Sequence, residues 1–358
     1  MWIADGWNDY EVLDTSAGEK LERWGDYILV RPDPQVIWNT PHKVREWKQK
    51  NGHYHRSNKG GGQWEFFDLP EQWEISYGNL KFHLKPFHFK HTGLFPEQAV
   101  NWEWSGNLIR EAKKKNPGKE IKVLNLFAYT GGATVACADA GAAVTHVDAS
   151  KGMVTWAKEN AAASGLANAP IRYLVDDCVK FVEREIRRGN HYDAIIMDPP
   201  SYGRGPKGEI WKIEEKIFPL VQLCTKVLAD KPLFFLINSY TTGLQPAVLS
   251  YMLNLELKSR FGGTVEADEI GLPVRGKQVL ILVVCMLLLV AMLRHLKQSR
   301  KLEKKLGVIN ENMAFHFEQM MDSKAQFEAE KAKERKAELL ASFNRMMEYA
   351  DRENVSAV

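Results

Sequence analysis

Apolar runs of strand length alternate with helical stretches through the middle of the chain. The runs are residues 123–127, 144–147, 171–175, 194–197 and 233–237. Longer stretches of helical character lie between them, such as GMVTWAKENAAAS and CVKFVEREIRRG. Strands that are apolar along their whole length are typical of a parallel sheet covered on both faces. The alternation therefore predicts an α/β fold with a Rossmann-like doubly wound sheet over residues 86–274.

Both ends of the chain follow other patterns. Residues 1–85 alternate short apolar and polar stretches between Gly, Pro and Asn, which predicts a small β-rich domain, and we expect it to recognise the substrate. Residues 275–358 start with an apolar block at 279–293, and apolar positions spaced three and four apart follow over 296–350. That spacing predicts a C-terminal tail with a long amphipathic helix, with a coiled coil as one form of it.

The apolar block at 279–293 has two interpretations. Its start could be the last strand of the sheet, in an antiparallel hairpin with residues 262–274. Alternatively, the block is a membrane helix with the basic residues from Arg294 onward on the cytoplasmic side, although it is shorter than the roughly 20 residues that a span prefers. The block is longer than an ordinary strand, which favours a helix at a membrane or an interface. The tail could thus tether the protein to a membrane or bind a coiled-coil partner.

Composition and charge narrow the class of protein. The chain has 358 residues, of which 45% are hydrophobic and 26% charged, as in a folded rather than a disordered protein. A net charge of only +3 means that any nucleic-acid surface must be local. Four scattered cysteines without a C-x-x-C pair, and an N-terminus without a signal-peptide pattern, predict a protein of the reducing cytoplasm.

Glycine or acidic residues follow four successive predicted strands. They are Gly131 with Gly132, Asp148, Asp176 with Asp177, and Asp198. In a doubly wound sheet the ligand binds at these carboxyl ends. An acidic residue after the second strand can reach a ribose diol, and one after the third can accept a hydrogen bond from an adenine amino group. The first turn lacks the pattern G-x-G-x-x-G, which disfavours an NAD-dependent oxidoreductase.

The same segments resemble a known family. VLNLFAYTGG, THVDAS, VDDCVKF and MDPPSYGRG stand at the places where class I S-adenosylmethionine-dependent methyltransferases have their motifs. The chain is similar to the bacterial large-subunit ribosomal RNA methyltransferases of that class, and HTGLFPEQAVNW at 91–102 resembles their lead-in. The resemblance covers residues 1–274 and not the tail. S-adenosylmethionine has no pyrophosphate, so the first turn needs no full glycine fingerprint.

The resemblance implies a cofactor site. It assigns the methionine end of the cofactor to Asn125, Phe127, Tyr129, Thr130 and Gly131. It further implies that Asp148 holds the ribose hydroxyls and that Asp177 faces the adenine. Asp148 as a helix cap, and Phe127 and Tyr129 as core aromatics, are the structural alternatives.

The segment DPPSYGRGPK predicts the acceptor side of the site. The Asp198 carboxylate and the Pro199 carbonyl can accept hydrogen bonds from an amino group of the acceptor. Ser201 stands where amino-methylating enzymes usually have an aromatic residue, so we expect Tyr202 to take that role. Arg204 and Lys207 follow in a loop and could bind a substrate phosphate.

Residues 42–64 predict an RNA-binding surface. The stretch carries six cations and three aromatic or imidazole rings: Lys43, Arg45, Lys48, Lys50, Arg56, Lys59, Trp47, Tyr54 and His55. Cations for phosphates and aromatic rings for unstacked bases are what single-stranded RNA recognition uses. A solvated basic loop is the alternative. His53 and His55 have no Cys or carboxylate at ligand spacing, so no metal is expected.

Together these features predict an enzyme that uses S-adenosylmethionine to methylate a nucleobase of RNA, with ribosomal RNA as the first candidate. Cytosine-C5 methylation is an alternative, but it needs a cysteine nucleophile, and neither DPPSY nor FLINSYTTG contains one. A non-RNA acceptor is another alternative. The non-enzymatic alternative is a membrane-linked interaction protein with an inert Rossmann domain.

Overall fold

The computed structural model describes residues 1–57, 61–87, 89–204, 210–241 and 244–276, together with scattered residues between 331 and 345. Residues 1–277 form one compact unit and residues 278–358 another. The predicted last strand or membrane helix at 279–293 lies outside the described residues. So does most of the predicted amphipathic helix, although the residues described between 331 and 345 are helical. No helix in the described part of the chain combines the length and hydrophobicity of a membrane span.

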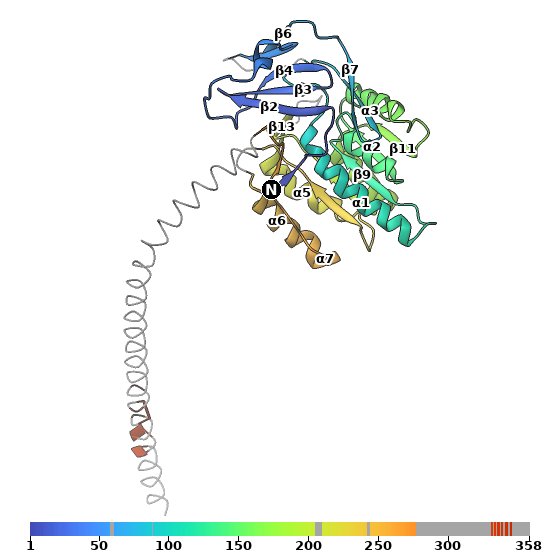
Figure 1. The fold of residues 1–358 in the computed structure, drawn as a ribbon. Coiled ribbons are helices and arrows are strands. Elements are labelled where there is room, and N and C mark those ends of the chain that lie inside the picture. The colour runs from blue at the N-terminus through green and yellow to red at the C-terminus, as the bar shows by residue number, and fades with distance from the viewer. Residues whose placement is uncertain are drawn as a thin grey trace, which may run out of the picture. The chain divides into compact units, whose positions relative to one another are not determined.

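A five-stranded parallel sheet forms the centre of the first unit (Figure 1). In spatial order its strands are β11 (Ile171–Val175), β10 (Ala143–Asp148), β9 (Lys122–Leu126), β12 (Ala194–Met197) and β15 (Phe234–Ile237). The chain order reverses between β9 and β12, which is where doubly wound sheets bind ligands. The predicted α/β fold is confirmed, and each strand lies within one residue of the predicted apolar run.

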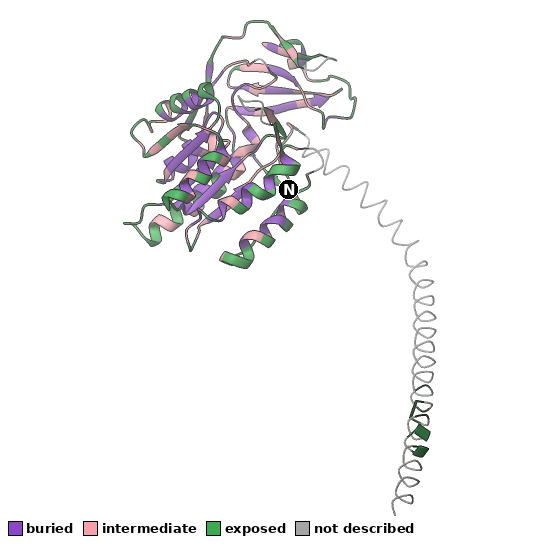
Figure 2. Ribbon diagram, turned by 180° about the vertical axis from the view of Figure 1, so that it is seen from behind, coloured by how far each residue is buried: buried purple, intermediate pink, exposed green. Residues whose placement is uncertain are grey.

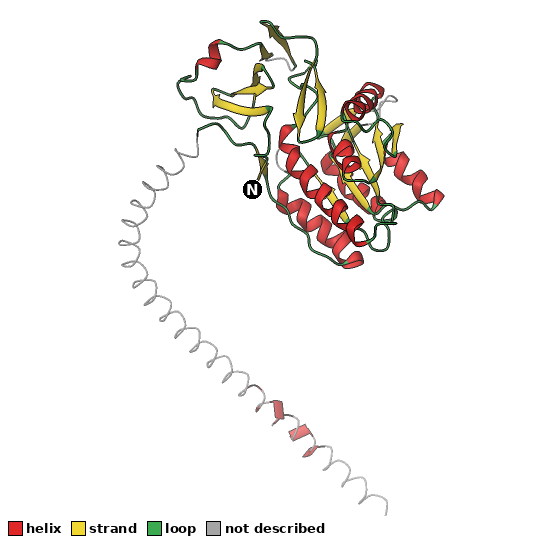
Figure 3. Cartoon of the chain, turned by 45° about the vertical axis from the view of Figure 1, so that its right-hand side comes forward, coloured by secondary structure: helices red, strands yellow, loops and turns green. Residues whose placement is uncertain are grey.

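Helices cover both faces of this sheet (Figure 3). One face carries α1 (Ala99–Lys115), α2 (Gly132–Asp139) and α3 (Lys151–Ala163), and the other carries α4 (Cys178–Arg188), α5 (Ile213–Cys224) and α6 (Pro246–Leu253). In β12, Ile195 and Met197 pack with α4 and α5. Ala194 and Ile196 face the other way, toward α1 and α2. Both sides of the strand are therefore apolar, and Figure 2 shows the strands buried between helices whose outer faces are exposed.

Three short helical segments complete this part of the fold. They are η2 (Pro96–Gln98), which leads into α1, and η3 (Asn254–Lys258) with α7 (Ser259–Phe261), which extend α6. The lead-in motif at 91–102 begins in the loop before η2 and runs into α1. It brings residues 94 and 95 to the carboxyl edge of the sheet, where they line a pocket with the turn after β9.

The residues before α1 are β-rich, as predicted. Five strands form a sheet in sequence order: β2 (Tyr10–Ser16), β3 (Glu19–Trp24), β4 (Tyr27–Pro32), β5 (Gly52–Arg56) and β6 (Gly62–Phe66). The segment between β4 and β5 contains η1 (Arg45–Lys48), and β7 (Trp73–Tyr77) pairs with β8 (Leu80–Leu84). Inside this sheet the buried Glu22 accepts hydrogen bonds from Arg31 at 2.6 and 2.8 Å and from Tyr10 at 2.7 Å.

The β-rich region packs directly on the helices of the central sheet. Asn160 of α3 accepts a hydrogen bond from the His83 amide at 2.9 Å, and the Trp156 indole donates to the His83 carbonyl at 2.9 Å. Trp102 of α1 packs edge-on against Trp7. Trp7 and Trp102 belong to a hydrophobic cluster shared by both regions, so the β-rich region is fixed against the face that carries α1, α2 and α3.

The segment 262–274 pairs with the N-terminal strands in the part that the structure describes. There, β16 (Ile270–Gly271) lies parallel to β1 (Trp2–Ile3), and Val274 bridges Val12 of β2. Arg275 donates hydrogen bonds to Glu11 at 2.6 and 2.8 Å. The other arm of the hairpin considered for this segment lies outside the described residues.

Candidate active site

The turn after β9 has an unusual backbone. Phe127 and Tyr129 have φ angles of 53° and 51°, and Gly131 has a φ of 83°. A Cβ on Gly131 would lie 2.8 Å from the Cβ of Ala157 in α3, so a side chain there meets both a strained backbone and a close neighbour. Residues other than glycine with positive φ are uncommon and cluster at functional sites. The turn is therefore a candidate binding site.

Asp148 at the end of β10 holds this turn. Its Oδ2 accepts a hydrogen bond from the Tyr129 amide at 2.9 Å, and its Oδ1 accepts one from the Ser150 amide at 2.8 Å. Burial raises the pKa of Asp148, and the two amide donors oppose that rise. The α3 cap is Ser150, whose hydroxyl accepts from the Met153 amide. Asp148 is therefore not the helix cap, and its oxygens keep lone pairs for a ligand.

Asp176 and Asp177 follow β11. Asp177 is exposed and caps α4, since its Oδ1 accepts a hydrogen bond from the Lys180 amide at 2.9 Å. Asp176 is half-buried and forms an ion pair with Arg184. The adenine contact of Asp177 stays a prediction, and its capping role commits one of its two oxygens.

Asn125 and Thr130 are buried, and their side chains form hydrogen bonds within the protein. Asn125 donates to the Thr134 hydroxyl at 2.9 Å, and that hydroxyl lies 2.9 Å from His146 Nδ1. Burial lowers the pKa of His146 to about 3, so the imidazole is neutral at physiological pH. Thr130 donates to the Gly93 carbonyl at 2.5 Å. Both predicted residues therefore fix the shape of the turn through their side chains.

A pocket opens at the carboxyl ends of β9, β12 and β15. Its walls come from the turn after β9, from the start of α1 with the loop before it, and from the ends of β12 and β15. Five predicted site residues line it: Asn125, Phe127, Tyr129, Thr130 and Asp198. Gly131, Asp148, Asp177, Pro199 and Tyr202 are not among its lining residues in the described structure.

Asp198 is an acidic residue that lines this pocket. It is half-buried, and its Oδ1 accepts a hydrogen bond from the Asn238 side chain at 3.1 Å. Burial raises the pKa of Asp198 to about 6; the Asn238 hydrogen bond acts against the rise, and the charge of Glu97 adds to it. A carboxyl group with such a pKa can change protonation state near neutral pH, as groups at catalytic sites often do.

The segment after Asp198 forms a small hairpin. Here, β13 (Tyr202–Arg204) pairs antiparallel with β14 (Ile210–Lys212). Tyr202 is 51% exposed, so its expected stacking role stays a prediction. The structure describes only the backbone of Arg204, and Lys207 lies outside the described residues.

The sequence prediction misses several residues around the pocket. Phe95 lies with its ring centroid 5.5 Å from that of Tyr129 and 5.2 Å from that of Tyr240. The Tyr240 hydroxyl donates to Glu97 at 2.9 Å. Asn238 follows β15, where a polar residue could have been suspected by analogy with the other strand ends. Phe95 and Glu97 belong to the lead-in motif, which the sequence marked without assigning roles.

On the β-rich region, His53 and His55 have carboxylate partners that the sequence spacing hides. His53 Nε2 lies 2.6 Å from Glu19 Oε1, and His55 Nε2 lies 2.9 Å from Glu65 Oε2. No carboxylate stands at ligand spacing in the sequence, but the fold brings Glu19 and Glu65 beside the two histidines, so the spacing alone does not exclude a metal.

Several proteins that are similar to this chain are methyltransferases. The S-adenosylmethionine-dependent methyltransferase family matches residues 47–222. The crystal structure of the SAM-dependent methyltransferase from Agrobacterium tumefaciens is 37% identical, has a TM-score of 0.64 and covers 70% of this chain and 79% of that chain. A methyltransferase crystallised with SAH has a TM-score of 0.55 at 21% identity over 73% of this chain and 68% of that chain, which shows the fold alone.

The curated relatives are longer proteins. The ribosomal RNA large subunit methyltransferase K/L of Shewanella frigidimarina is 35% identical over 160 residues, 44% of this chain and 21% of that protein. The protein of the same name from Pseudoalteromonas atlantica is 28% identical over 255 residues, 63% of this chain and 34% of that protein. The chain thus spans about a fifth to a third of these relatives. The sheet order and the turn after β9 agree with the family match and with the Agrobacterium structure. Together these findings show that the chain belongs to the S-adenosylmethionine-dependent methyltransferase family.

Proposed function

We propose that this chain transfers a methyl group from S-adenosylmethionine to a nucleobase of RNA, with ribosomal RNA as the first candidate. One observation carries the proposal. Asp198, with its pKa near 6, faces a pocket that also contains the turn predicted to hold the cofactor. The names of the curated relatives support RNA as the acceptor.

The residues at the strand ends fit this cofactor. Asp148 is a half-buried acceptor with lone pairs to spare, which suits a ribose diol. The half-buried ring of Phe127 lines the pocket and offers an apolar contact to the methionine end of the cofactor. Bound S-adenosylmethionine supplies an electrophilic methyl group. The protein then has to orient the acceptor and exclude water.

Asp198 and Pro199 are proposed to orient the acceptor. Above pH 6 the Asp198 carboxylate is ionised and can accept a hydrogen bond from an amino group of the base, while Asn238 restrains its position. The Pro199 carbonyl is proposed to accept a second hydrogen bond from that amino group. Phe95 lines the pocket beside Tyr129 and offers a flat surface for a base, a role for which Tyr202 remains the predicted alternative.

The described cysteines support nitrogen rather than cytosine C5 as the methylated atom. Cys137, Cys178 and Cys224 are buried, and burial raises the pKa of each, that of Cys137 to about 12. A cysteine nucleophile needs a lowered pKa and access to the substrate. None of these three cysteines lines the pocket.

The basic stretch 42–64 contributes charge more than stacking surfaces. Lys43, Arg45, Lys48 and Arg56 are exposed, which suits contacts with phosphates. Trp47 and Tyr54 are buried, so the expectation that bases stack on them is wrong. Of the three expected rings, His55 is exposed. Phe66 and Phe67 are exposed just after the stretch, and Lys50 lies over the Phe67 ring at 5.4 Å.

The test is methylation with cofactor that carries a labelled methyl group. The purified chain is incubated with total RNA, protein extract or small metabolites, and labelled RNA is digested for nucleoside mass spectrometry. We expect label in RNA, in a nucleoside modified on nitrogen. Label in protein alone would refute the proposal, and a 5-methylcytosine product would refute nitrogen as the target atom.

A further inference from the structure

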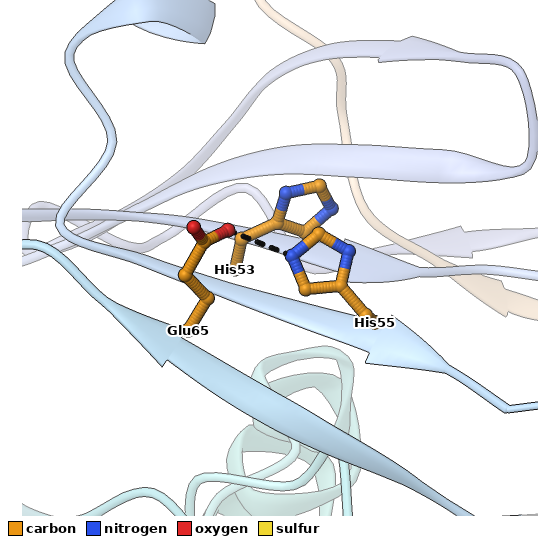
Figure 4. A group of neighbouring side chains, drawn as sticks. All are labelled: His53, His55 and Glu65. Atoms are coloured by element: carbon orange, nitrogen blue, oxygen red, sulfur yellow. Dashed lines mark hydrogen bonds and ion pairs between the residues drawn. The ribbon is translucent and has the colours of Figure 1, made fainter.

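Two histidines and a glutamate project from the same face of the β5–β6 hairpin (Figure 4). His53 and His55 are alternate residues of β5, and Glu65 of β6 is the cross-strand partner of His53. One nitrogen of each histidine and one carboxylate oxygen of Glu65 all lie within 4.8 Å of one another. The imidazole centroids are 3.9 Å apart. We propose that His53, His55 and Glu65 bind a divalent transition-metal ion such as Zn²⁺.

The backbone beneath these side chains is well fixed. On the opposite face of the hairpin, Tyr54 is buried and packs edge-on against Trp64 at 5.5 Å. Gly62 pairs with Arg56, and a Cβ on Gly62 would lie 2.2 Å from the His55 carbonyl, so the strands approach closely there. Because residues two apart on a strand share a face, the register keeps the three candidate ligands together.

The chemistry of the three side chains selects the class of ion. Imidazole nitrogen suits Zn²⁺, Cu²⁺ and Ni²⁺, whereas Ca²⁺ and Mg²⁺ prefer oxygen ligands. Two imidazoles and one carboxylate, with part of the coordination sphere left to water, form a set that Zn²⁺ accepts. His53 is the least exposed of the three, with 13% of its side chain accessible, compared with 46% for His55 and 50% for Glu65.

Glu19 of β3 is a second carboxylate beside this cluster. Its Oε1 lies 2.6 Å from His53 Nε2. Carboxylates that contact a metal-binding imidazole orient the ring and increase its basicity, and their loss typically weakens metal binding by about 10–100-fold. Glu19 is therefore assigned a positioning role toward His53.

The experiment uses the full chain, stripped with a chelator and titrated calorimetrically with ZnCl₂. We expect one site per chain that His55→Ala and Glu65→Gln each abolish. Glu19→Gln should weaken that site by about 10–100-fold. His191→Ala and Glu74→Gln, which change a histidine and a glutamate outside the cluster, should leave it intact.

Thermal unfolding with Zn²⁺ or with chelator gives an independent readout. Zn²⁺ should raise the melting temperature of the wild-type chain and of the two control variants, and not that of His55→Ala. Circular dichroism in chelator verifies that every variant is folded. An undetectable site in the wild-type chain, or one that survives both His55→Ala and Glu65→Gln, overturns the proposal and leaves the histidine–glutamate pairs as hydrogen bonds of the sheet surface.

Discussion

At the scale of single residues, the candidate site contains three aspartates in different surroundings. Asp148 is half-buried and accepts two backbone amides, Asp177 is an exposed helix cap, and Asp198 accepts one side-chain amide in a pocket. Such surroundings determine which carboxyl groups stay ionised at neutral pH and which have a pKa close to neutral pH. The three side chains are chemically identical, so their proposed roles follow from burial and partners.

Asp148→Ala should lower the affinity for the cofactor about 10–100-fold, because roughly 1.5–3 kcal/mol of charge-assisted hydrogen bonding to the ribose is lost. Calorimetry with S-adenosylhomocysteine measures this. Asp176→Ala is the matched control, since Asp176 pairs with Arg184 and has no proposed ligand contact. Equal effects of both substitutions would contradict the role of Asp148.

Asp198 should make methyl transfer depend on pH. Its raised pKa of about 6 means that the carboxyl group is protonated below pH 6 and ionised above it. Because the proposed role needs the ionised form, kcat/KM should rise as pH increases through about 6 and then level off. Asp198→Asn should be far slower, without this step in its profile, and should bind the cofactor normally. A wild-type profile that is flat between pH 5 and 7 (roughly one unit either side of the pKa) would contradict the role.

At the scale of elements, the sequence predicts what depends on local pattern and misses what depends on pairing. The five central strands could be located because a strand buried on both faces is apolar throughout. The burial of Trp47 and Tyr54 could not be predicted from the sequence, because it depends on how η1 and β5 pack on other strands. The same holds for Glu65 beside His53, which only the β5–β6 register brings together. Phe95 and Asn238 reach the pocket from separate elements, and no local pattern records that meeting.

Gly131→Ala should destabilise the turn after β9 more than an ordinary glycine substitution. The new Cβ would have both an unfavourable φ of 83° and a contact of 2.8 Å with Ala157. We expect a loss of roughly 2 kcal/mol or more in the free energy of unfolding, together with weaker cofactor binding. Gly189→Ala at the end of α4 separates the two causes, because Gly189 has a φ of 67° and a Cβ added there would meet nothing within 4 Å. Gly189→Ala should lower the free energy of unfolding by about 1 kcal/mol, as measured by urea unfolding. Similar losses for both would show that the contact with Ala157 is unimportant.

The buried pair of β3 and β4 should control the stability of the β-rich region. Burial opposes ionisation of Glu22, but Arg31 and its hydrogen bonds prevail and lower the Glu22 pKa to about 2. This contribution to stability is present above the unfolded-state pKa near 4.5 and is lost as pH falls toward 2. Arg31→Met should lower the free energy of unfolding by about 3 kcal/mol, because the buried Glu22 carboxylate loses both hydrogen bonds to Arg31 and keeps only Lys20 and Tyr10 as partners. Glu22→Gln combined with Arg31→Met should cost less than Arg31→Met alone, as measured by urea unfolding at pH 7. A double variant that is less stable than Arg31→Met would contradict the buried charge of Glu22 as the cause.

At the scale of the whole molecule, residues 1–277 form a compact unit that contains every described residue of the candidate active site. A chain that ends after Lys277 should therefore keep its affinity for S-adenosylhomocysteine. A chain that ends after Asp268 also lacks β16 and Val274, and it should be less stable because β1 and Val12 lose their partners. Calorimetry and thermal unfolding of the two truncated chains test this. Loss of binding in the longer one would show that residues 278–358 contribute to the site.

The pairing of β1 with β16 joins the beginning of the unit to its last described strand. Its first strand and its last described strand are parallel hydrogen-bonded neighbours, so residue 2 lies beside residue 270, while residues 274 and 275 lie further on, beside Val12. Ends that lie close together allow a chain to be joined there and opened elsewhere. A circular permutant could therefore connect residue 276 to residue 1 through a linker that runs back along β16 and β1, and begin at the exposed loop around Gly118, between α1 and β9. In that order the central parallel sheet would be synthesised first, then the β-rich region and finally α1, with all the pairings of the fold kept.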